Sequence, residues 1–120
     1  MVRWPHITKT AEDYDRKLLE YDLDIYKNFY GPFFPYWPQG GKSDSEHIQD
    51  IKNSGFFVGG TVEESIKQWR STYEQVPAEY ITLIFHWAQQ PKDDLLEEIE
   101  LFMTKVLPEL EIPDFAVAAE

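Results

Sequence analysis

Two short groups of residues in this chain have side chains and spacing suited to chemistry. His86 and Trp87 end the apolar run YITLIFHW, and Gly59, Gly60 and Thr61 follow the apolar residues FFV. An imidazole can donate a hydrogen bond or a proton near neutral pH, and an indole can wall an apolar ligand. Glycines before a helix can leave its free N–H groups open to a phosphate. The first group predicts a pocket, and the second predicts a phosphate site.

Both groups also have a structural explanation. His86 and Trp87 can simply cap the core, and a Gly-Gly turn followed by Thr61 and Glu64 matches a capping box at a helix start. Glu63 and Glu64 would occupy the first helical turn, where their charges repel an anion. For the glycine turn we therefore favour the capping box over the phosphate site, whereas for His86 and Trp87 both alternatives stay open.

The elements that must position these residues follow one another between residues 56 and 108. Residues 56–58 predict a short strand, and the residues after Thr61 have the apolar spacing of a helix that ends near Pro77. Residues 80–87 are almost continuously apolar or β-branched, as in a strand covered on both faces. A last helix is expected from Pro91 to Pro108, with the acidic residues of 93–100 on a solvated face.

The rest of the chain predicts mainly helix. Residues 11–30 have a helical apolar pattern with Thr10 as N-cap, and Ser43 with Glu46 forms a capping box for a short helix. Residues 1–10 are expected to be an irregular N-terminal arm, and residues 113–120 a loose tail. The sequence thus predicts one α/β domain over residues 11–112, with two parallel strands and about four helices.

A parallel pair of strands is an incomplete sheet. Parallel sheets are normally larger and covered on both faces, and an open strand edge is a template for association. We therefore expect the chain to form a homo-oligomer, most simply a twofold dimer, or to bind a companion chain that completes the sheet.

Composition excludes several classes of partner and site. The formal net charge of −11 disfavours nucleic acid and anionic membrane surfaces, and no apolar run is long enough to span a bilayer. The N-terminus has no apolar signal-peptide core, so a cytoplasmic location is expected. The chain has no cysteine, and its three histidines share no ligand spacing, so no metal site is expected.

Three segments in order, FFVGGTVEESIKQW, YITLIFHW and LLEEIELFMTKVLPEL, are similar to the C-terminal end of the luciferase-like flavin monooxygenases. In that family a V-G-(S/T)-x-E-E turn follows the seventh strand of a (β/α)8 barrel, and the eighth strand often ends in an aromatic or His-Trp pair. The extra Gly60 and the basic Lys105 depart from the family pattern. The resemblance covers residues 11–112 but only about the last third of a family member.

The resemblance implies part of a (β/α)8 barrel and an oxidoreductase that uses reduced flavin, FMN or a deazaflavin, together with O2. It places His86 and Trp87 beside the flavin and substrate pocket. Because two-thirds of the barrel is absent, we expect this chain alone to be inactive. The alternative is a non-catalytic remnant that serves as a protein-binding or oligomerisation module, and the chain could also be a fragment of a longer parent.

Overall fold

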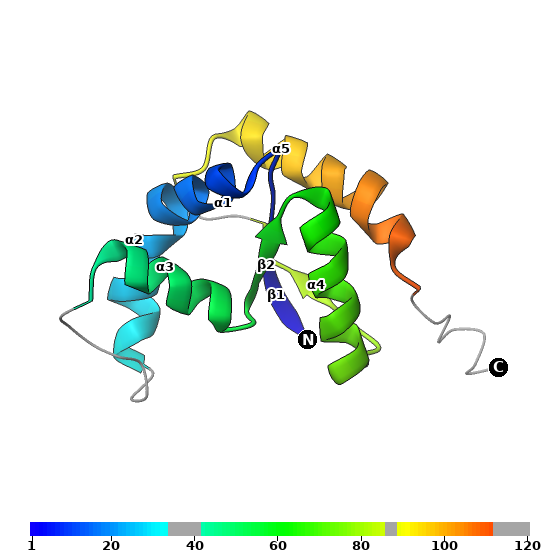
Figure 1. Cartoon of the computed structure of the whole chain (residues 1–120), viewed down its shortest axis with the longest axis horizontal. Coiled ribbons are helices and arrows are strands. Elements are labelled where there is room, and N and C mark those ends of the chain that lie inside the picture. Colours follow the sequence, from blue (N-terminus) through cyan, green and yellow to red (C-terminus); the bar gives the residue numbers. More distant parts are fainter. Residues whose placement is uncertain (34–41, 86–88, 112–120) are drawn as a thin grey trace.

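The computed structural model describes residues 1–33, 42–85 and 89–111 as a three-stranded parallel sheet flanked by helices (Figure 1). The strands are β1 (Val2–Ile7), β2 (Phe57–Gly60) and β3 (Thr82–Leu83). The α-helices are α1 (Ala11–Lys17), α2 (Leu23–Ile25), α3 (Asp44–Asn53), α4 (Val62–Gln75) and α5 (Lys92–Leu101). Wider π-helical turns, Leu18–Asp22 and Tyr26–Tyr30, make α1 and α2 parts of one helical segment, and α5 continues through Phe102–Val106 into the 3-10 turn Leu107–Glu109.

The strand order is β2-β1-β3, with every pair parallel. β1 pairs with β2 from Trp4 opposite Phe57 to Ile7 opposite Gly60. The prediction of an irregular arm over residues 1–10 is therefore wrong, because this segment supplies the central strand. The sheet has three strands rather than two, and the two predicted strands each pair with β1 instead of with each other.

Strand β3 is shorter than the predicted strand over residues 80–87. Among the described residues it spans only two positions, Thr82 and Leu83, opposite Val2 and Arg3 of β1. Ile84 still donates its N–H to the carbonyl of Arg3 at 2.9 Å. The next donor along β1 would be Pro5, which has no N–H, so the β1–β3 ladder stops there.

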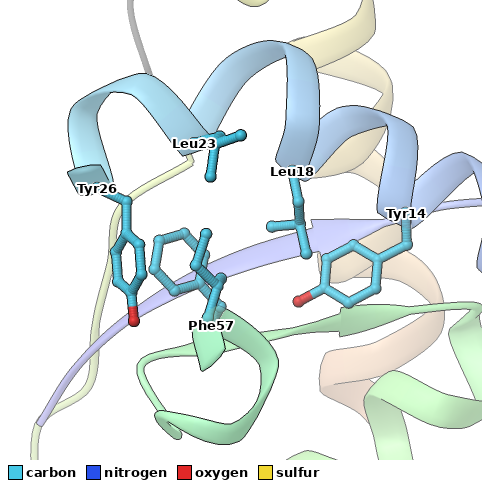
Figure 2. Close-up of a cluster of buried hydrophobic side chains, with 6 residues drawn as sticks. Tyr14, Leu18, Leu23, Tyr26 and Phe57 are labelled. Atoms are coloured by element: carbon cyan, nitrogen blue, oxygen red, sulfur yellow. The ribbon is translucent and has the colours of Figure 1, made fainter. Parts of the chain in front are cut away.

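The two faces of the sheet are covered by different helices, as the alternation of side chains along a strand requires. On one face, Phe57 packs among side chains of the segment from α1 to Tyr26; Figure 2 shows Tyr14, Leu18, Leu23 and Tyr26 around it. The neighbouring Val58 points to the other face. Its cluster there consists of Ile7, Val58, Trp69, Phe102 and Val106, from β1, β2, α4 and the last helical segment. The chain is therefore a three-layer α/β structure.

The predicted helix starts are confirmed by their caps. The Thr10 hydroxyl accepts the N–H of Asp13 at 3.1 Å, which begins α1. Ser43 and Glu46 form the predicted reciprocal capping box at the start of α3. Local side-chain chemistry thus sets these boundaries.

Candidate functional site

Of the two predicted groups of site residues, only Gly59, Gly60 and Thr61 lie among the described residues. Gly59 and Gly60 end β2, and Thr61 caps α4. His86 and Trp87 lie outside the described residues, so their role in a pocket stays a prediction.

Close packing and capping account for the glycine turn. A Cβ at Gly59 would collide with the His6 carbonyl and lie 2.9 Å from Cε2 of Tyr14, while Gly60 has a φ of 116°, which favours glycine. The Thr61 N–H donates to Oε2 of Glu64 at 2.8 Å, and the N–H of Glu64 donates back to the Thr61 hydroxyl at 3.3 Å. The turn's exposed donor is thus already satisfied by a carboxylate. The phosphate site stays a prediction that this charge disfavours.

A buried cluster of charged side chains lies near the carboxyl end of β1. His6 is only 3% exposed, and its Nε2 lies 2.6 Å from Oδ2 of Asp22. Its Nδ1 lies 3.0 and 3.2 Å from the two carboxylate oxygens of Glu98 on α5. The imidazole is therefore held between two carboxylates from different helical segments.

The cluster continues from Glu98 to the surface. Lys17 of α1 donates to Oε1 of Glu98 at 2.5 Å and to Oδ1 of Asp94 at 3.0 Å. Gln90 contacts the other Asp94 oxygen at 3.4 Å. Glu98 is 1% exposed, so the prediction that the acidic residues of 93–100 form a solvated face is wrong at this position. Two cations from other elements, His6 and Lys17, make its burial possible.

The electrostatics of the cluster favour a protonated His6. Burial alone would lower the pKa of His6, but the hydrogen bonds and negative charges of Asp22 and Glu98 outweigh it and raise the pKa to about 9. Burial also lowers the pKa of Lys17, and Glu98 and Asp94 more than offset that effect. Burial raises the pKa of Asp22 above its ordinary value. At neutral pH the cluster therefore holds an imidazolium and an ammonium between carboxylates.

This arrangement can fix elements in place, but it does not expose a reactive atom. His6, Lys17, Asp22 and Glu98 are each less than 5% exposed, so a substrate could not reach them in this arrangement. Oδ1 of Asp22 is buried and has no hydrogen-bond partner among the described residues. The interactions tie α1, the turn after it and α5 to the central strand, and we interpret the cluster as the device that positions these elements.

Sequence reasoning missed this cluster because each member looked ordinary in its own segment. Glu98 stands four residues before Phe102 and eight before Val106, which places it on the buried stripe of its helix. Lys17 similarly stands three residues after Tyr14 and next to Leu18, on a buried face. A charged residue in phase with an apolar stripe was the available signal.

The described part of the chain offers neither a metal site nor a membrane span. There, no group of three or more His, Asp or Glu side chains has an arrangement that could hold a metal ion. No helix in that part is long and apolar enough to cross a membrane. Comparison with known proteins found no matching family model and no similar curated protein.

Proposed function

We propose that this chain is the C-terminal segment of a luciferase-like, flavin-dependent monooxygenase and that it works only when the rest of the sheet is supplied. The observation that carries the proposal is the unit formed by β2, its Gly-Gly turn and α4. This unit has the strand, turn and capped helix of the V-G-(S/T)-x-E-E segment in the family that the sequence resembles. The parallel direction of all three strands is compatible with an α/β oxidoreductase.

The strand order of the described sheet differs from that of a (β/α)8 barrel. In a (β/α)8 barrel consecutive strands are neighbours, whereas here β1 lies between β2 and β3. The three sequence segments therefore support the proposed barrel and oxidoreductase activity, and the strand order does not.

The residues at the described turn do not fit the phosphate of a flavin. Glu64 accepts the Thr61 N–H, and Glu63 and Glu64 both lie in the first turn of α4. A bound FMN or deazaflavin would need its phosphate held by residues elsewhere. The proposed contribution of this chain is the wall formed by His86 and Trp87, and the flavin would supply the redox chemistry.

A flavin titration tests the proposal. Purified chain is titrated with FMN, and separately with a deazaflavin, while flavin fluorescence is followed. Saturable quenching of flavin fluorescence that is lost in Trp87→Ala supports the proposal. Phe33→Ala is the control, because Phe33 is an aromatic side chain that is 69% exposed, and this variant should keep the quenching. No binding even at millimolar flavin overturns the flavin-binding role for the isolated chain.

A second candidate is a protein-binding or oligomerisation module. The specific observation in its favour is that the described sheet has only three strands and ends at β2 and β3. Several large apolar side chains are also exposed, among them Tyr80 at 77%. Both candidates need a partner that extends the sheet, and the simplest is a second copy of the chain.

A further inference from the structure

The two edges of the sheet differ in whether their backbone groups are satisfied. At β2, the N–H groups of Trp4 and Thr8 donate to the carbonyls of Phe56 and Gly60. Alternate residues of β2, including Gly59, must therefore direct their N–H and C=O groups away from β1, toward the outer edge.

A side chain closes this outer edge of β2. The amide of Gln68 on α4 accepts the Gly59 N–H at 3.2 Å and donates to the Gly59 carbonyl at 2.7 Å. One amide group thus makes the two hydrogen bonds that a residue of a fourth strand would make. An incoming strand would have to displace Gln68 before it could pair with Gly59, so this edge is protected against association.

Among the described residues, no comparable side chain closes the edge at β3. Thr82 and Ile84 donate their N–H groups to β1, at 2.8 Å to the Met1 carbonyl and 2.9 Å to the Arg3 carbonyl. Leu83, between them, therefore directs its N–H and C=O to the outer side. The sheet ends at β3, and no described strand lies beyond it.

The surroundings of the β3 edge suit an identical partner. The N-terminal ammonium donates to the Tyr80 carbonyl at 2.9 Å and brings one positive charge to this edge. Tyr80 and Val2, 77% and 42% exposed, add apolar surface. Two copies of one strand related by a twofold axis pair antiparallel and satisfy each other's outer groups.

We propose that two copies of this chain associate through their β3 edges, pairing β3 antiparallel to its twofold mate, while Gln68 keeps both β2 edges out of the interface. This inference rests on the self-association included in the proposed function. It adds which edge is used and why the assembly stops at two.

Introduced cysteines test the edge, because the natural chain contains none. Thr82→Cys places a single thiol in β3, and Tyr80→Cys and Ile84→Cys place one two residues before it and two residues after it. Ser71→Cys is the matched control, since Ser71 is an exposed residue that lines the groove beside Gln68 at the β2 edge. Each purified variant is treated with a short bis-maleimide, and the mass of the untreated chain is measured by light scattering.

The expected result is a mass twice that of the monomer. At least one of the variants at or beside β3 should give a crosslinked dimer, and Ser71→Cys should give none. A dimer mass with crosslinking only at Ser71→Cys would overturn the choice of edge and leave self-association standing. A monomer at every concentration, with no crosslinking, would overturn both. Flavin binding is measured separately, so its presence or absence does not affect this outcome.

Discussion

Replacing His6 by glutamine should remove a defined, pH-dependent part of the stability. His6 is the buried cation between Asp22 and Glu98, and its pKa rises from 6.5 to about 9 on folding. At about 1.4 kcal/mol per pH unit, this rise corresponds to roughly 3 kcal/mol of stability. That is also the lower end of the cost, about 3 to 5 kcal/mol, of breaking a buried ion pair by removing one partner.

The sign follows from proton linkage. Because the folded state binds the His6 proton more tightly than the unfolded state, the stabilisation is complete below pH 6.5. It is lost as the pH rises from 6.5 through 9. The natural chain should therefore lose roughly 3 kcal/mol of unfolding free energy between pH 6.5 and 9.5, beyond any change in His6→Gln.

Urea unfolding followed by tryptophan fluorescence, at several pH values from 6 to 9.5, measures this difference. His47→Gln is the matched control, because His47 is also buried but makes no ion pair with a carboxylate among the described residues. It should keep the pH dependence of the natural chain. If the natural chain and His6→Gln lose stability in parallel over this range, the His6 proton does not stabilise the fold and the reasoning about the cluster fails.

Two other substitutions test the packing and the edge. Gly59→Ala should lower the unfolding free energy by about 3 kcal/mol, because its methyl would meet the His6 carbonyl and the Tyr14 ring. The control is Gly55→Ala, where φ is 76° and an added Cβ would meet no atom within 4 Å. It should lower the unfolding free energy by only about 1 kcal/mol. Equal losses in thermal unfolding would contradict the close contact at Gly59. Gln68→Ala should uncover the β2 edge and yield assemblies larger than the dimer in light scattering, and an unchanged mass would show that the amide does not control association.

Local signals predicted the helices well, and the strands less well. The caps at Thr10, Ser43 and Thr61 depend on residues three positions apart, so the sequence alone contains the whole interaction. Strand β1 escaped prediction because Pro5 and His6 argue against a central strand when they are considered alone. In the structure Pro5 ends the β1–β3 ladder on one side of β1, while the pairing with β2 continues on the other side. The carboxylates of Asp22 and Glu98 compensate the charge of His6.

The same distinction applies to the candidate site. The buried role of Glu98 depends on Lys17 and His6, which come from other elements, and no local pattern could indicate that these three side chains meet. The predicted site residues were chosen from short motifs instead. The capping-box motif of Thr61 and Glu64 identifies the Gly-Gly turn as a helix start, and it also implies the bond from the Thr61 N–H to the Glu64 carboxylate that the structure contains.

The contact between His6 and Glu98 joins residues 92 positions apart, so it also bears on how the chain folds. Such a contact closes a loop of 92 residues, and during synthesis it can form only after Glu98 has left the ribosome. Until then His6 and Lys17 lack Glu98, and burying them would leave their charges poorly compensated. We therefore expect the N-terminal strand to settle into the sheet late, when α5 arrives. A chain cut before Lys92 should remain open and prone to proteolysis.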